Sequence, residues 1–186
     1  MAAGETGVRF IKRMANPFSK PIRERFSEDI KEYAEQFYCA AEILRDQPSS
    51  AGVSTACIVN ASLSIELFLK ALCSERRFHN VKDHKNGLFS CEMTSSPVVK
   101  SHSLTKIWNE IPSDIKNKAR VEFKKTILFE EYQQIESVLK IYNQTFEQQR
   151  YSFENINNSV FNITKLFYLL YFIRNLVLGI EEAIDN

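Results

Sequence analysis

The stretch NASLSIELFLKALCSE, residues 60–75, decides the fold. Apolar residues occur on all sides of it, so we expect a central, buried helix over about residues 53–78. Glu66 and Lys70 interrupt the apolar surroundings four residues apart, in the order that favours an intrahelical ion pair. Because burying two charges is costly, this pair is expected to have a further partner, with His102 and Arg150 as candidates.

The flanking patterns predict further helices and no strands. Ser27 is a plausible N-cap for a helix over residues 27–46. Helical spacing continues over residues 102–111, over 113–146 with a break near Leu128, and over 159–183. Residues 79–101 lose all periodicity and predict a long loop. The expected fold class is therefore all-α, a bundle of four to five helices with a long loop between helices 2 and 3.

Residues 1–26 are set apart by their charge. Two prolines, Pro17 and Pro21, and only two acidic residues accompany the basic side chains, which are Arg9, Lys12, Arg13, Lys20, Arg23 and Arg25. The segment is interpreted as a basic N-terminal arm that is either flexible or docked on a protein partner. The helical domain is expected to span residues 27–186.

Composition and cysteine content narrow the class further. The net charge of +1 does not indicate a general nucleic-acid binder. The four cysteines form no CxxC pair, and the amino terminus lacks the apolar core of a signal peptide. The apolar run LFYLLYFI is interrupted at Arg174, short of the roughly 20 residues that span a membrane. These features predict a cytoplasmic chain without a membrane segment, a metal site or a cofactor.

Three segments in a fixed order resemble HEPN domains. ASLSIELFLKALCSE, residues 61–75, resembles the helix with an IELxLKALL core of that superfamily. SHSLTKIWNEIP, residues 101–112, is similar to its HxLxxLxxxLP segment, and FEQQRYSFEN, residues 146–155, to its WRYxxE-type segment. With the residues between them, the resemblance covers roughly residues 53–160.

The resemblance implies a helical bundle that is commonly a homodimer. Many HEPN domains are metal-independent ribonucleases with an R-x(4 to 6)-H motif at the start of the last helix. Others have lost this motif and act as binding or scaffolding modules. Prokaryotic members belong to toxin–antitoxin and anti-phage defence systems. For this chain the resemblance implies a homodimer or a subunit of a larger assembly, with RNA as a candidate partner.

Arg150 stands where the resemblance expects the arginine of that motif, but no histidine follows it. A histidine suits proton transfer because its unperturbed pKa lies near 6.5. If the chain is catalytic, the candidate residues are Arg150 with Glu154, Asn157 or His102. Glu154 can act as a base only if burial raises its pKa, and His102 would replace the missing histidine from another position.

A polar cluster is also predicted. Glu66, Lys70, His102 and Arg150 are expected to share one region, and Asn60 and Tyr151 are added as candidate binding residues. Such a cluster more often fixes helix packing than binds a ligand, and the catalytic or RNA-binding interpretation is the sharper alternative.

Three functional hypotheses follow. The first is a HEPN-like module of a prokaryotic defence or toxin–antitoxin system that acts through protein or RNA contacts without standard ribonuclease chemistry. The second is a divergent metal-independent ribonuclease that uses Arg150. The third is a purely structural oligomerisation bundle.

Overall fold

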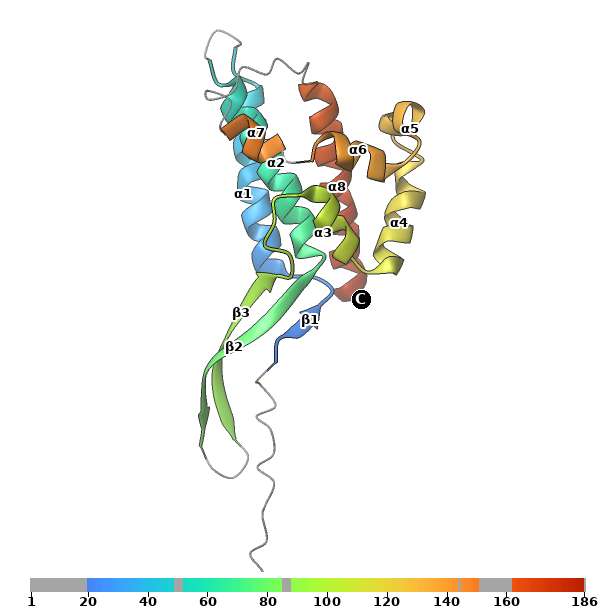
Figure 1. The fold of residues 1–186 in the computed structure, drawn as a ribbon. Helices are drawn as coiled ribbons and strands as arrows, with labels where there is room; N and C mark the ends of the chain where they lie inside the picture. Colours follow the sequence, from blue (N-terminus) through green and yellow to red (C-terminus); the bar gives the residue numbers. More distant parts are fainter. Residues whose placement is uncertain (1–19, 49–51, 85–87, 144, 151–161, 186) are drawn as a thin grey trace, which may run out of the picture.

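The computed structural model describes residues 20–48, 52–84, 88–143, 145–150 and 162–185. The described chain is mostly helical, with a small antiparallel sheet at one end (Figure 1). Its elements are β1 (Ile22–Glu24), α1 (Glu28–Arg45), α2 (Ser54–Ala71), β2 (Ser74–Asp83), β3 (Phe89–Pro97), α3 (Leu104–Glu110), α4 (Ser113–Phe123), α5 (Ile127–Tyr132), α6 (Ile135–Ile141), α7 (Thr145–Arg150) and α8 (Ile163–Asp185).

Helix α1 has the start that the sequence predicts. The Ser27 hydroxyl caps it by accepting a hydrogen bond from the Ile30 amide at 3.4 Å. Glu28 and Asp29 add negative charge to the first turn, where the helix dipole favours it. The amide of Ser27 also donates to Ala71 O at 2.9 Å, which joins the start of α1 to the end of α2.

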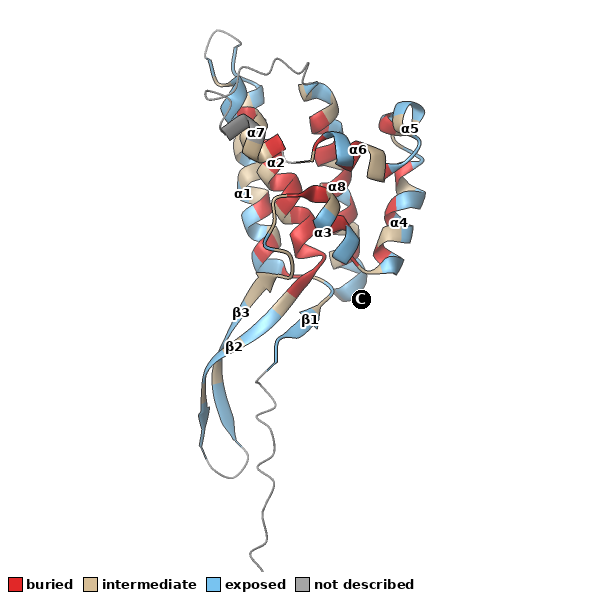
Figure 2. Ribbon diagram, in the orientation of Figure 1, coloured by how far each residue is buried: buried red, intermediate tan, exposed pale blue. Residues whose placement is uncertain are grey.

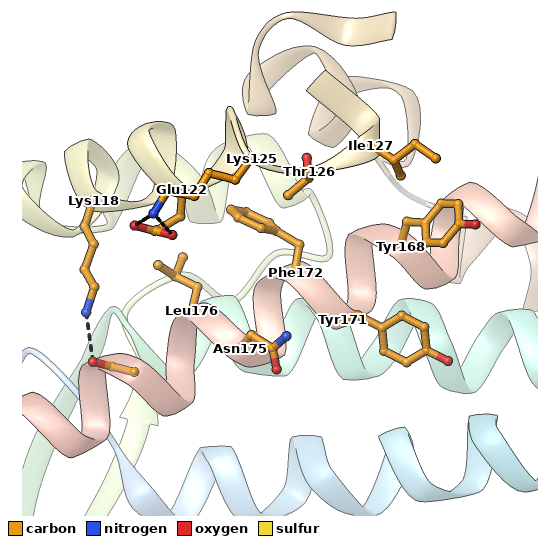
Figure 3. Close-up of a pocket in the computed structure, with 11 residues that line it drawn as sticks. Lys118, Glu122, Lys125, Thr126, Ile127, Tyr168, Tyr171, Phe172, Asn175 and Leu176 are labelled. Carbon is orange, nitrogen blue, oxygen red and sulfur yellow. Dashed lines mark hydrogen bonds and ion pairs between the residues drawn. The ribbon is translucent and has the colours of Figure 1, made fainter. Parts of the chain in front are cut away.

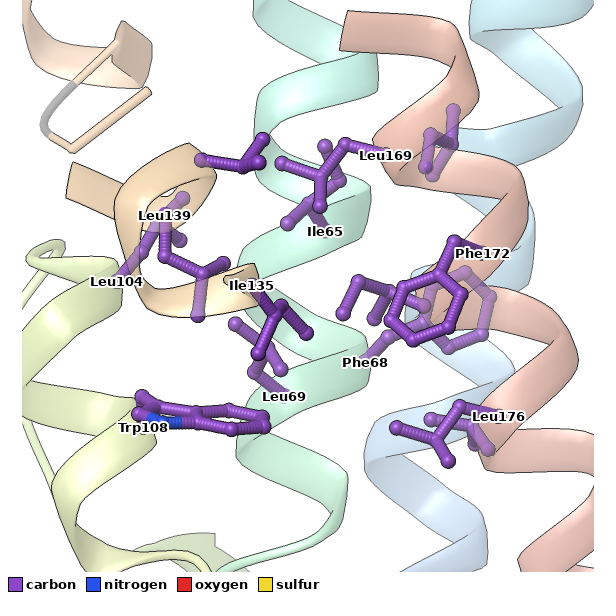
Figure 4. Close-up of a cluster of buried hydrophobic side chains, with 14 of the residues drawn as sticks. Ile65, Phe68, Leu69, Leu104, Trp108, Ile135, Leu139, Leu169, Phe172 and Leu176 are labelled. Carbon is purple, nitrogen blue, oxygen red and sulfur yellow. The ribbon is translucent and has the colours of Figure 1, made fainter. Parts of the chain in front are cut away.

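Helix α2 is the central buried element, as its apolar sequence predicts. The long helices α1 and α8 and the short helices α3 and α7 pack around it, and the buried residues concentrate on α2 and on the surfaces facing it (Figure 2). Phe68 and Leu69 of α2 meet Leu169 of α8, Trp108 of α3 and Ile135 of α6 in one continuous apolar core (Figure 4). The hydrophobic effect on this shared core holds the helices together.

Polar contacts fix α1 against α8 outside the core. Arg174 Nε donates to both oxygens of Glu35, at 2.9 and 3.0 Å, and its guanidinium lies 4.5 Å from the centre of the Tyr38 ring. Lys31 Nζ lies 2.6 Å from Glu181 Oε1. These partly buried pairs set how the two helices align.

The prediction of an all-α bundle is wrong. Helix α2 ends at Ala71, and the segment expected to be a long loop forms two antiparallel strands, β2 and β3. The hairpin projects from the helical body at the end where α2 finishes (Figure 1). Most of its residues are exposed or half-buried, so neither face carries the apolar alternation by which a strand is recognised in a sequence.

Strand β1 covers only the base of the hairpin. It pairs with β2 from Ile22 opposite Arg76 to Glu24 opposite Ser74. The Glu24 carboxylate accepts from Arg76 at 2.6 Å and from Ser95 Oγ at 3.1 Å, so one acidic side chain ties three strands together. Residues 22–24 of the predicted arm therefore pair with the chain's own sheet, and Arg23 and Arg25 form ion pairs with Glu110 and Asp114. Residues 1–19 lie outside the described part.

The region predicted as one or two long helices is four short ones, α4 to α7. Helix α4 ends at Phe123, earlier than the break expected near Leu128. Gln133 adopts a left-handed conformation, with φ of 59°, and ends α5. Periodic apolar residues continue through these turns because each short helix keeps one face on the core, so spacing alone did not reveal the breaks.

Helix α8 is the only helix among the described residues that is long and apolar enough to cross a membrane. Half of its most apolar window is buried inside the protein. Core helices of soluble proteins have the same length and composition, and the described chain does not have the several spans of a polytopic membrane protein.

The Glu136 carboxylate joins α3, α4 and α6 and gives a test of this packing. It accepts from Trp108 Nε1 at 3.2 Å and from Arg120 Nε at 2.8 Å. Burial alone raises the pKa of the Glu136 carboxyl, but hydrogen bonds from its own backbone amide, Arg120 and Trp108 outweigh burial and lower that pKa.

Because this pKa is lowered by folding, Glu136 contributes stability above its unfolded pKa of about 4.3 and loses it as the pH falls through the folded value. We expect Glu136→Gln to flatten the loss of stability between pH 6 and pH 3 in urea unfolding. Glu122→Gln, which removes an exposed carboxylate of α4, is the matched control. An acid dependence equal in wild type and Glu136→Gln would contradict this role.

Candidate functional site

Glu66 and Lys70 lie on one face of α2, one turn apart. Lys70 Nζ donates to Glu66 Oε1 at 2.6 Å. Glu66 is 2% exposed and Lys70 is 7% exposed, so both charges are removed from water. A buried pair of this kind is stable only where further hydrogen bonds satisfy its atoms.

His102 provides that further contact from the turn before α3. Its Nδ1 lies 2.9 Å from Glu66 Oε2 and 3.1 Å from Glu66 Oε1. Because a carboxylate only accepts hydrogen bonds, Nδ1 carries the proton and donates it. In the neutral imidazole, Nε2 is then the atom with a free lone pair, and it has no hydrogen-bond partner within the described part of the chain. The side chain is 41% exposed, so solvent reaches the ring.

Helix α7 closes the other side of the cluster. The Phe146 ring lies 4.9 Å from the His102 ring, measured between centroids. Helix α7 also packs on α2 and carries Arg150 at its end, one helical turn after Phe146. The structure thus brings the helix of Arg150 to His102, although the Arg150 side chain is outside the described part.

A small cavity lies between these elements. The centre of a water molecule could occupy about 10 Å³ of this cavity, which is close to the space that one bound water requires. Ser62, Glu66, His102 and Thr145 line it together with apolar side chains. The Ser62 hydroxyl is buried and has no hydrogen-bond partner in the described structure, so a water molecule here would satisfy it.

The structure does not place the other predicted residues in the Glu66–Lys70–His102 cluster. Asn60 lies on α2, where its side-chain amide donates to Ala56 O at 2.7 Å, and it takes no part in the cluster. Tyr151, Glu154 and Asn157 lie outside the described residues. The predicted contact of Glu66 with Lys70 and His102 is therefore observed, and the rest of the predicted site stays a prediction.

Ser62 was missed by the sequence reasoning. Its spacing could have revealed it, because Ser62, Glu66 and Lys70 follow one another at four-residue steps on one face of a helix that is otherwise apolar. Thr145 and Phe146 had no such signal, because both belong to α7, a separate short helix packed on α2 that the spacing did not reveal.

The described residues contain no group of three or more His, Cys, Asp or Glu side chains that could hold a metal ion. Cys73 is buried in the core, and burial raises the pKa of its thiol to about 12. His79 and His84 lie on the hairpin, with ring nitrogens 2.9 Å from Thr94 Oγ1 and 2.7 Å from Ser90 Oγ.

Fold and site together define a helical protein with a projecting β-hairpin and a buried Glu66–Lys70 pair that bonds to a partly exposed His102. No protein-family model, curated protein or solved structure matches this chain.

Proposed function

We propose that this chain is a HEPN-like module, with a β-hairpin inserted between its first and second resembling segments, that contacts RNA at the Glu66–Lys70–His102 cluster. One observation carries the proposal. The three segments on which the resemblance depends lie far apart in the sequence, yet each contributes to this cluster. Glu66 comes from the first, His102 from the second and Phe146 from the third.

The chemistry of the cluster suits a phosphate–sugar backbone. The His102 side chain is 41% exposed, and Arg150 belongs to the adjacent helix. An arginine stays charged and can bond two phosphate oxygens, and histidine and aromatic rings stack on unpaired bases. The buried Glu66–Lys70 pair holds the imidazole in place.

The resemblance supports the wider setting of the proposal. The module would act in the cytoplasm of a prokaryote, within a defence or toxin–antitoxin system, as a homodimer or as a subunit of a larger assembly. The basic arm would contact a protein partner through its residues before β1. If the chain does not bind RNA, a purely structural scaffold is the alternative.

A specific observation favours a second candidate, a divergent metal-independent ribonuclease. A carboxylate that accepts from Nδ1–H leaves Nε2 as a proton acceptor, the orientation used by catalytic imidazoles. His102 Nε2 would take the proton of a ribose 2′-hydroxyl as its oxygen bonds to phosphorus. The P–O5′ bond would then break to give a 2′,3′-cyclic phosphate. The 5′-oxygen would take a proton from water, and the imidazolium would return its proton to the hydroxide so formed. Arg150 would stabilise the charge on phosphate, with Glu154 or Asn157 as further candidates.

Binding of tRNA and total RNA at increasing salt tests the first candidate. We expect affinity to fall with salt, and Arg150→Ala to lower the salt slope by about one phosphate contact. His102→Gln should weaken binding as well. His79→Gln, which replaces a histidine of the hairpin, is the matched control and should bind as wild type does. Absence of salt-dependent binding by the folded wild type would contradict the proposal and favour a scaffold.

Cleavage of the same RNA in the presence of EDTA tests the second candidate. If the chain is a ribonuclease, His102→Gln should lower the cleavage rate about 10²- to 10⁴-fold. The products should carry 2′,3′-cyclic phosphate ends. Cleavage that survives in His102→Gln and in Arg150→Ala would exclude this mechanism.

A further inference from the structure

A second and larger concave site lies on the side of the helical body, away from the cluster. It is a groove of about 520 Å³ between α8 and the α4–α5 segment (Figure 3). This volume is within the range of small-molecule sites in proteins, about 300–1,000 Å³. Its wall on α8 extends from Tyr168 to Gly179, roughly 16 Å along the helix at about 1.5 Å per residue.

Most of the groove is apolar and aromatic. Tyr168 and Phe172 form the wall on α8 at one end, and Ile127 faces them from the start of α5 (Figure 3). Tyr168 is 40% exposed and Ile127 is 60% exposed. A flat ring lying against these side chains would remove apolar surface from water, which is the main driving force for binding in such sites.

The opposite end of the groove carries a positive charge. Lys118 Nζ donates to the Gly179 carbonyl at 2.8 Å, and no carboxylate pairs with it among the described residues. The nearby carboxylate of Glu122 is already paired, with both oxygens 2.8 Å from Lys125 Nζ. An ammonium group has three donors, so Lys118 can bind an anion while it keeps its bond to the carbonyl.

Gly179, which lines the groove, is independent support for a ligand that binds there. A glycine inside a helix costs about 1 kcal/mol relative to alanine, so a reason for it is expected. A Cβ at this position would meet only Lys118 Nζ, at 3.8 Å, an ordinary contact. Packing within the described chain therefore does not require glycine here, whereas close approach of a ligand to the helix backbone would.

We propose that this groove binds a small organic anion with an aromatic body. The ring system would lie against Tyr168 and Phe172, and a carboxylate, sulfonate or phosphate group would bond Lys118 beside Gly179. The inference is independent of the RNA proposal, because the groove shares no residue with the Glu66–Lys70–His102 cluster.

Titration with 8-anilinonaphthalene-1-sulfonate, which has an aromatic body and one sulfonate, tests the proposal by fluorescence. We expect saturable binding at one site per chain. Lys118→Met keeps the aliphatic stem but removes the charge, and should raise Kd at least about tenfold. Gly179→Leu should fill the groove and abolish the signal. Lys116→Met is the matched control, because its amine also donates to a backbone carbonyl, Asn109 O at 3.2 Å, outside the groove.

The dye also binds partly unfolded states, so each variant is checked by circular dichroism and thermal unfolding. Loss of binding in Gly179→Leu and weakening in Lys118→Met, with Lys116→Met unchanged and all three folded, supports the site. Absence of saturable binding would overturn the proposal. So would affinity unaffected by either groove variant, and an effect of Gly179→Leu without one of Lys118→Met would overturn the assignment of an anionic ligand.

Discussion

Replacing Glu66 with glutamine is expected to lower the free energy of unfolding by about 3–5 kcal/mol. The substitution keeps the shape of the side chain but leaves the Lys70 ammonium without its counter-charge, 2.6 Å from a neutral amide in a site that is almost closed to water. Small domains have a total stability of about 5–15 kcal/mol, so the loss is a large share of it. Urea unfolding at neutral pH measures the difference.

Two controls test whether the loss of stability comes from leaving one buried charge without its partner. Glu122→Gln breaks an exposed ion pair with Lys125 and should cost less than about 1 kcal/mol. The double variant Glu66→Leu/Lys70→Met removes both buried charges, and it should recover most of the stability lost in the single variant. A Glu66→Gln variant no less stable than Glu122→Gln would contradict the account of the cluster.

Phe68→Ala is expected to have an effect of similar size, about 3–5 kcal/mol. Phe68 is fully buried on α2 and lies between that helix and α8, near Phe172 (Figure 4). Removing its ring leaves a cavity at the contact between α2 and α8. A fall in the urea midpoint with an unchanged slope would show that stability changed and the unfolded state did not.

The matched control is the same substitution on the hairpin. Phe89 of β3 is 42% exposed, so Phe89→Ala should cost less than about 1 kcal/mol. If both variants lost equal stability, the helical core would not be the main source of the stability of the chain.

The helices that pack on the core could be predicted because their buried positions are apolar and recur at helical spacing. Helix α1 begins with a capping serine, and α2 is apolar on all sides, so position and burial of both were predictable. The hairpin was not, because most of its residues face solvent and its sequence mixes charged, polar and apolar residues on both faces. Besides the pairing of β2 with β3, the hairpin is held at its base by Glu24, a residue distant in the sequence from β3.

The cluster was predictable in its chemistry but only partly in its membership. Two charges on an apolar helix required a partner, and His102 is that partner. Ser62 and Phe146 are there because of packing, which sequence spacing shows for Ser62 and does not show for Phe146. The groove beside α8 has one visible feature in the sequence, which is Gly179 inside a helix.

The most direct test of an RNA contact at the cluster is nitrogen-15 NMR of the imidazole side chains while tRNA is added. The chain has three histidines, His79, His84 and His102, so the spectrum is simple, and His102→Gln assigns the signal of interest. We predict that RNA shifts the Nε2 resonance of His102 and leaves those of His79 and His84 in place. An unchanged His102 resonance at saturating RNA would contradict the proposed function.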